Sequence, residues 1–254
     1  MPDPATLATL AIAAGAFLVA GLVKGVVGFG FPVIALAIMT IAIGLLDALA
    51  IVILPAFLTN LWQATSGGHL RDIVGRLWSY MLMAVIFIVV GSRYLNVGNA
   101  AQLTATLGGL LCLYAVFSLA RVSFVVPRKA EPVLAPLLGI INGTLTGLTG
   151  SFMVPSVFYL HATGFRGEYL VQALGIYFCL SSFTLAASMA GRDLISIDHA
   201  LLSALALVPS FVGMSAGRRL RRRIDPAGFE RAFFTAVLLL GASLLWRAAR
   251  GSVA

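Results

Sequence analysis

Two glycine-rich stretches decide the fold: residues 21–32 read GLVKGVVGFGFP, and residues 143–155 read GTLTGLTGSFMVP. Three glycines keep the same spacing in both copies, and the closing proline matches after a one-residue insertion. Each copy lies between long apolar stretches. Glycines that interrupt paired apolar segments in both halves of a chain indicate a transporter with a binding site near the middle of the membrane.

The composition is that of a membrane protein. Only 10% of the 254 residues are charged and 60% are hydrophobic, whereas roughly 25% of the residues of a soluble domain are charged. The apolar runs are continuous, which favours helices over the alternating pattern of a membrane barrel. We therefore expect an all-α polytopic protein in contact with a lipid bilayer. The net charge of +8 is explained by basic residues at segment ends, so no nucleic-acid partner is expected.

Ten apolar segments are expected. They lie at residues 5–23, 29–45, 48–66, 77–92, 101–120, 133–150, 152–163, 169–190, 199–217 and 232–246. A spanning helix needs about 20 residues, and the second and seventh segments are shorter, as half-helices are. Five segments precede the polar connection and five follow it. This odd number predicts two inverted repeats, at residues 1–124 and 133–254, joined by a loop at 125–132.

The basic residues predict the orientation. If all ten segments cross, thirteen basic residues share one side and four share the other. The positive-inside rule then places both termini on the outer side of the membrane. A hairpin that enters and leaves on one side has the same parity as two crossings. The charges therefore leave two alternatives, ten spans or six spans with two re-entrant hairpins.

Lys24 is the basic residue most closely enclosed by apolar sequence. A charge at membrane depth costs about 2.5–3.5 kcal/mol on insertion scales, which makes it a functional candidate, although a lysine at a segment end also extends to the surface. Glycines beside it permit unwound backbone, and the next helix start would attract an anion. The residues of this first cluster expected to bind substrate are Lys24, Gly25, Gly28, Phe29 and Gly30.

The second cluster replaces the charge with hydroxyl groups that can donate to an anion. We expect the seventh segment to start near Phe152 or Met153, so that both clusters face one central pocket. The alternative is that the Gly-x-x-x-Gly spacings in both clusters serve close helix packing, which also permits a homodimer. The second-cluster candidates are Thr146, Gly147, Thr149, Gly150 and Ser151. Further candidates inside spans are Asn60, Gln63, Ser181 and Ser182, with Asn142 similar, and each could instead make an interhelical hydrogen bond.

Motifs of catalysis and metal binding are missing from the sequence. It contains no metalloprotease, serine-hydrolase or nucleotide-binding motif. Its two cysteines lie in apolar stretches, where packing is their expected role. We therefore expect no catalytic residue, no metal and no cofactor.

The chain resembles the TauE/SafE family of sulfite exporters over nearly its whole length. The resemblance rests on Gly21-x-x-Lys24-Gly25-x-x-Gly28-Phe-Gly30-x-Pro32 and on Gly143-x-x-x-Gly147-Leu-Thr-Gly150-Ser-x-x-x-Pro155. It implies an inner-membrane permease for small sulfur-containing anions such as sulfite, sulfoacetate or other organosulfonates.

The expected function is thus a secondary transporter that exports a small oxyanion by alternating access, driven by an ion gradient or the membrane potential. Two alternatives remain open at this point. One is an anion channel, and the other is a membrane subunit that serves a partner enzyme.

Overall fold

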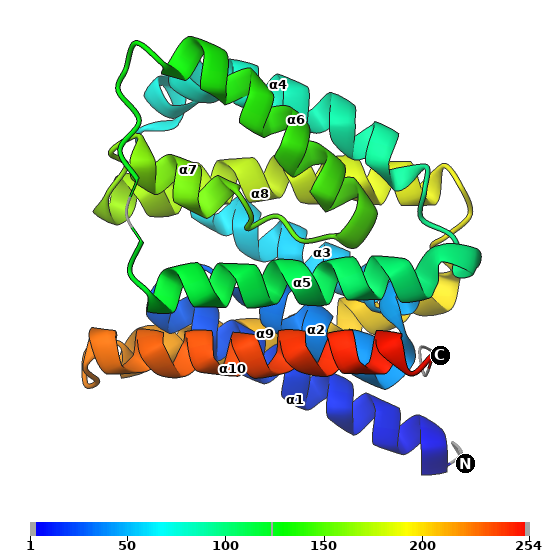
Figure 1. Ribbon diagram of the computed structural model, residues 1–254. Helices are drawn as coiled ribbons and strands as arrows, with labels where there is room; N and C mark the ends of the chain where they lie inside the picture. The colour runs from blue at the N-terminus through cyan, green and yellow to red at the C-terminus, as the bar shows by residue number, and fades with distance from the viewer. Residues whose placement is uncertain (1–3, 123, 252–254) are drawn as a thin grey trace.

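The computed structural model describes residues 4–122 and 124–251, and these form helices and no strand (Figure 1). The helices are α1 (Pro4–Val27), α2 (Phe31–Ile43), α3 (Leu45–Thr65), α4 (Leu70–Ser92), the 3-10 turn η1 (Val97–Asn99), α5 (Ala100–Leu119), α6 (Glu131–Thr149), α7 (Ser156–Ala162), α8 (Gly167–Ala190), α9 (Ile197–Leu220) and α10 (Pro226–Ala249). The all-α prediction is confirmed.

Eight of the described helices are long and apolar enough to cross a membrane. The other two are α2, with 13 residues, and α7, with seven, which are the second and seventh segments of the sequence. The chain is therefore a multi-pass membrane protein with two short helices among its spans.

Two helices begin well before their apolar runs. The expected starts were residues 77 and 232, whereas α4 begins at Leu70 and α10 at Pro226. The Asp225 carboxylate caps α10 by accepting from the backbone N–H groups of Ala227 (3.2 Å) and Gly228 (2.8 Å). Hydropathy marks only the part of a helix that lipid can cover, so it misses polar first turns that project beyond it.

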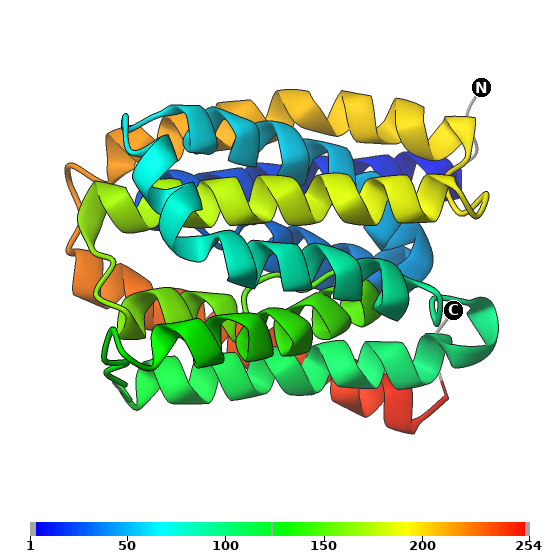
Figure 2. The same ribbon diagram turned by 90° about the horizontal axis from the view of Figure 1, so that it is seen from above.

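Helices from the two halves of the chain pair with one another. Helix α1 packs along α9, α6 along α4, α3 along α8, and α5 along α10. The α3 and α8 spans are the most buried, with 61% and 67% of the residues in their apolar 18-residue stretches inside the protein. Seen from above, α8 runs across the middle of the bundle (Figure 2). The core is therefore built between the halves, not within either one.

Glycines allow these pairs to approach closely. On α1, Gly21 and Gly25 face the α9 backbone, and Gly213 and Gly217 of α9 face the α1 backbone. A Cβ atom added at any of the four would collide with backbone atoms of the partner helix. The packing interpretation of these Gly-x-x-x-Gly spacings is confirmed. These four glycines are thus occupied by contacts within one chain, and the possible homodimer stays a prediction.

The second pair repeats this arrangement. On α6, Gly139, Gly143 and Gly147 face the α4 backbone at Tyr80, Ala84 and Ile88, and Gly91 of α4 faces the backbone of α6. The glycines of the second motif that lie within α6 thus serve helix packing as well.

The two ends of the bundle differ in charge. The connections α3–α4, α5–α6, α7–α8 and α9–α10 lie at one end, where most of the basic residues gather, and we call it the basic end (Figure 1). Helix α1 begins and α10 ends at the opposite end, which we call the terminal end (Figure 1).

Two neighbouring glycines of α5 test the packing. A Cβ on Gly108 would lie 2.8 Å from the Gly241 carbonyl oxygen, whereas a Cβ on Gly109 meets nothing within 4 Å. We expect Gly108→Ala to lower the free energy of unfolding by about 1–3 kcal/mol through overpacking. Gly109→Ala should leave it unchanged or raise it by up to about 1 kcal/mol. Thermal unfolding of both variants in detergent measures the difference, and equal midpoints would contradict the close α5–α10 contact.

Candidate functional site

A pocket of about 680 Å³ lies at the basic end, between α1, α3, α8, α9 and the start of α10. Its buried inner part carries Lys24, Thr59 and Gln63. Its apolar walls include Val27, Phe29, Trp62, Val171 and Met214. Its exposed outer part carries Glu168, Arg218, Arg221 and Glu230. The pocket thus has charged residues at its inner and outer ends and apolar walls between them.

Lys24 lies at the inner end of this pocket, one turn before the end of α1. Its side chain is only 4% exposed, so it does not extend to the surface. The ammonium donates to Thr59 Oγ1 (3.2 Å) and to Asn60 Oδ1. The Thr59 hydroxyl donates its own proton to the Pro55 carbonyl (2.7 Å), so its oxygen acts as the acceptor for the Lys24 ammonium.

Neutral acceptors alone hold this ammonium. Among the described residues, no carboxylate forms an ion pair with Lys24, and no other charged side chain is buried. Asn60 Nδ2 is also buried and has no hydrogen-bond partner among those residues. A buried charge without a counter-charge is costly. The inner end of the pocket therefore favours an anion.

The chain breaks at the first glycine cluster, but later than expected. The first segment was expected to end at residue 23, whereas α1 continues to Val27, and the Gly28 N–H donates to the Lys24 carbonyl (2.8 Å). The break comes at Gly28 and Gly30, whose φ angles of 93° and 97° suit glycine. The reason is that Gly21 and Gly25 must be helical to pack against α9.

The broken segment is fixed from α3 and starts the next helix. Gln63 Nε2 donates to the Gly28 carbonyl (2.5 Å). Gly30 is the N-cap of α2, and no side chain caps this helix start. Phe29 lies between the two glycines and packs edge-on against Phe233 of α10 (6.4 Å between ring centroids).

The second cluster also breaks the chain, and here the expected helix start is wrong. Helix α6 runs to Thr149 and ends at Gly150, whose φ is 69°, and α7 begins at Ser156 instead of Phe152 or Met153. The intervening backbone is tied to α6. Thr146 Oγ1 donates to the Ser151 carbonyl (3.1 Å), and Thr149 Oγ1 accepts from the Ser151 N–H (3.2 Å). These hydroxyls therefore stabilise the break.

The structure brings only part of the predicted site together. The predicted residues that line the pocket are Lys24, Gly25, Gly28, Phe29 and Gln63. Asn60 holds Lys24 without lining the pocket itself. The residues that do not line it are Gly30, Thr146, Gly147, Thr149, Gly150, Ser151, Ser181 and Ser182. In this conformation the two glycine clusters do not share one pocket.

Three tyrosines form a buried polar cluster that the sequence reasoning missed. With the Asn142 amide oriented to match donors and acceptors, Asn142 Oδ1 accepts from Tyr80 (2.5 Å) and Tyr177 (3.0 Å), and Nδ2 donates to the Val154 carbonyl (3.0 Å). Tyr159 stacks on Tyr80 with ring centroids 5.2 Å apart. The available signal was the set of tyrosines inside apolar segments, because a buried Tyr needs a hydrogen-bond partner.

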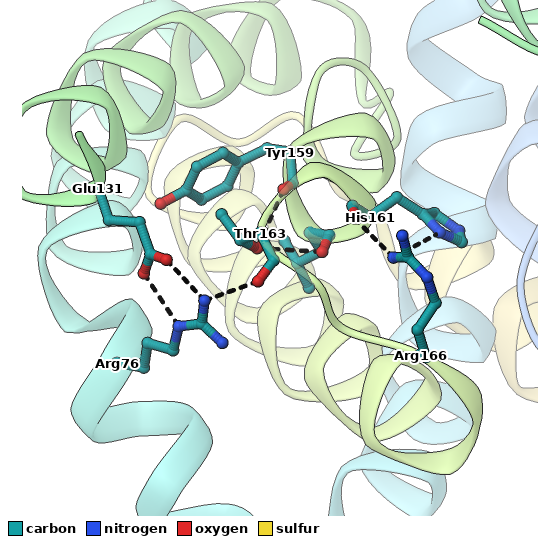
Figure 3. Close-up of polar contacts among 7 residues, drawn as sticks. Arg76, Glu131, Tyr159, His161, Thr163 and Arg166 are labelled. Carbon is teal, nitrogen blue, oxygen red and sulfur yellow. Dashed lines mark hydrogen bonds and ion pairs between the residues drawn. The ribbon is translucent and has the colours of Figure 1, made fainter. Parts of the chain in front are cut away.

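One arginine joins both ends of the α6–α7 segment at the basic end (Figure 3). Arg76 of α4 makes a bidentate ion pair with Glu131, the first residue of α6, at 2.6 and 2.9 Å. The same guanidinium donates to the carbonyl of Thr163, just after α7 (2.7 Å). Nearby, Arg166 donates to the carbonyls of His161 (2.5 Å) and Phe165 (2.7 Å). The segment therefore starts and finishes at the same end of the bundle.

Comparison with known proteins yields one match. The family model described as sulfite exporter TauE/SafE matches residues 12–244. No curated protein and no solved structure matches the chain.

Lys24 and Asn60 contribute unequally to stability in the absence of ligand. Lys24→Met removes an ammonium without a counter-charge but leaves Asn60 Oδ1 unpaired, so the two effects oppose each other and the free energy of unfolding should change by less than about 1 kcal/mol. Asn60→Ala removes an acceptor of a charged donor and should cost about 1.5–3 kcal/mol. Thermal unfolding in detergent without added anions measures both. A loss in Lys24→Met as large as that in Asn60→Ala would mean that the ammonium is well compensated.

The tyrosine cluster gives a second test of stability. Asn142→Ala leaves the hydroxyls of Tyr80 and Tyr177 unpaired, at a cost of about 1–3 kcal/mol for each buried group. Adding Tyr80→Phe and Tyr177→Phe removes the unpaired hydroxyls and should recover part of the loss. Denaturant unfolding of the single and triple variants tests this, and strictly additive losses would disprove the shared network.

Proposed function

The chain belongs to the TauE/SafE family of sulfite exporters, and on that premise we propose that it is a secondary transporter that exports a small sulfur-containing oxyanion. Sulfite and organosulfonates are the proposed substrates. Transport proceeds by alternating access, and no catalytic step is involved.

The observation that carries this proposal is the ammonium of Lys24 at the inner end of the pocket. It is buried, it has only neutral hydrogen-bond acceptors among the described residues, and the pocket leads from it to the basic end. An oxyanion entering there supplies the missing counter-charge and accepts the remaining ammonium proton. Helix α2 begins just beyond the lining residues Gly28 and Phe29, and its start, which no side chain caps, places a positive helix end near the pocket.

Alternating access requires two related halves, and we propose that residues 1–124 and 133–254 are inverted repeats joined by residues 125–132. The helix pairs support this, because the first helix of each half packs on the fourth helix of the other. The short helices support it too: Arg76 joins both ends of α6–α7 at the basic end, whereas Arg247 reaches the end of α2 at the Ile41 carbonyl (2.5 Å). In this proposal α1–α2 and α6–α7 are re-entrant hairpins from opposite sides.

The second cluster then serves the opposite state of the cycle. Ser151 Oγ is buried and has no partner among the described residues. When the halves move, Thr146, Ser151 and Ser181 contact the anion in place of water. The hydroxyl groups would therefore bind the anion in that state, although they do not line the present pocket.

The proposed location is the bacterial inner membrane, with the basic end in the cytoplasm and both termini in the periplasm. The pocket then loads from the cytoplasm, as an exporter requires. A negative interior favours the exit of an anion by about 2.3 kcal/mol per charge per 100 mV. The membrane potential alone can therefore drive uniport.

Flux from proteoliposomes tests the proposal. Purified protein in vesicles with an imposed negative interior should release sulfite with saturable kinetics. Lys24→Met should slow release at least tenfold, because a hydrogen bond from a charged group is worth roughly 1.5–3 kcal/mol.

Lys129→Met is the matched control, because Lys129 is the other lysine of the sequence and is exposed in the connecting loop; its flux should equal that of the unchanged protein. Non-saturable flux would favour the channel alternative. Protein that releases none of the proposed anions would favour a subunit that serves a partner enzyme.

A further inference from the structure

We propose that the pocket selects organic anions with a single negative charge, namely a sulfonate-type head group on an apolar carbon chain. The proposal concerns the pocket of the proposed function and rests on it. It narrows the substrate class, because sulfite, sulfonates and the dianion sulfoacetate are no longer equivalent.

The charges of the lining favour one negative charge. The lining carries three basic side chains and two acidic ones, a net charge of +1 with His161 neutral. The basic ones are Lys24, Arg218 and Arg221, and the acidic ones are Glu168 and Glu230.

The positions of these charged side chains determine the selectivity more than their net charge does. Only Lys24 is buried, and the other four are exposed at the outer part of the pocket. The Arg218 guanidinium lies over the Trp62 ring, 5.9 Å from its centroid. A monoanion on Lys24 forms a neutral pair in a poorly solvated place, whereas a dianion brings a second charge that no inner cation meets.

The size and the walls of the pocket favour an organic group. A water molecule occupies about 30 Å³ in the liquid, so an oxyanion of four heavy atoms fills only a small part of the roughly 680 Å³. Between Lys24 and the outer charges, Val27, Val171 and Met214 present apolar surface. Val171 also lies close to the break between α1 and α2, since a Cβ on Gly28 would lie 3.1 Å from the Val171 side chain. A carbon chain attached to the anionic head would cover this surface.

A series on one two-carbon skeleton separates charge from size. Ethanesulfonate carries one negative charge, sulfoacetate carries two, and taurine is a zwitterion without net charge. Binding to the purified protein is measured by anion-dependent thermal stabilisation and competition, and transport is measured by flux from proteoliposomes. Ethanesulfonate should bind at least tenfold more tightly than sulfoacetate or taurine. From methanesulfonate to propanesulfonate, affinity should rise about fourfold per methylene group.

Three variants assign the effects to residues. Lys24→Met should abolish the preference for ethanesulfonate over taurine, and Lys129→Met should retain it. Val171→Ser should flatten the dependence on chain length while keeping the preference for one charge. Each variant is first checked for an unfolding midpoint in the absence of anions, so that loss of binding is not loss of fold.

The outcomes separate this inference from the proposed function. Equal binding of sulfoacetate and ethanesulfonate, with both transported, overturns the selection of monoanions and leaves the exporter intact. Binding that prefers ethanesulfonate without flux of any anion supports the selectivity and removes the transport function. A flat chain-length series overturns the organic part of the proposal.

Discussion

Backbone-to-backbone contact between helices of opposite halves is the constraint on which the other features depend. Lipid tails are as apolar as the side chains, so moving a side chain from lipid to a neighbouring helix brings little hydrophobic free energy. Close van der Waals packing between the helices must therefore supply the attraction. Glycine stripes provide that fit where α1 meets α9 and where α6 meets α4. On α1, the stripe of Gly21 and Gly25 faces α9, which turns Lys24 toward Thr59 and Asn60 of α3. The packing that joins the halves therefore also places the charge.

Neutral polar groups around the pocket hold positions without neutralising charge. Asn60 and Thr59 accept from Lys24, and Gln63 fixes the broken backbone at Gly28. Gln172 of α8 donates to the Ala64 carbonyl (3.0 Å) and accepts from the His69 N–H (3.0 Å), which ties α8 to the end of α3. The Gln63 and Gln172 amides donate to backbone carbonyls, which an ionised carboxylate cannot do, and they add no negative charge beside the ammonium.

The sequence predicted the elements well, because hydropathy and glycine spacing are local properties. All ten segments appear as helices, the short ones are short, and the chain breaks near both glycine clusters. The end of α1 and the start of α7 were missed. Helix α1 continues past residue 23 because Gly25 packs on α9, a partner that lies far away in sequence. The pocket was only half predicted for the same reason: Val171, Met214 and Arg218 reach it through helix pairing that no local pattern reveals. The tyrosines around Asn142 come from three helices and were equally invisible.

The contact of Arg76 with Glu131 and Thr163 has a mechanical consequence. The Arg76 guanidinium binds the chain at the start of α6 and again just after the end of α7, so one side chain links the two ends of residues 131–163. The far end of this segment, at Gly150 and Ser151, is held differently, because it is buried against Leu49 and tied to α6 through Thr146 and Thr149. The segment is therefore anchored by an exchangeable ion pair at the basic end and by close packing inside the bundle.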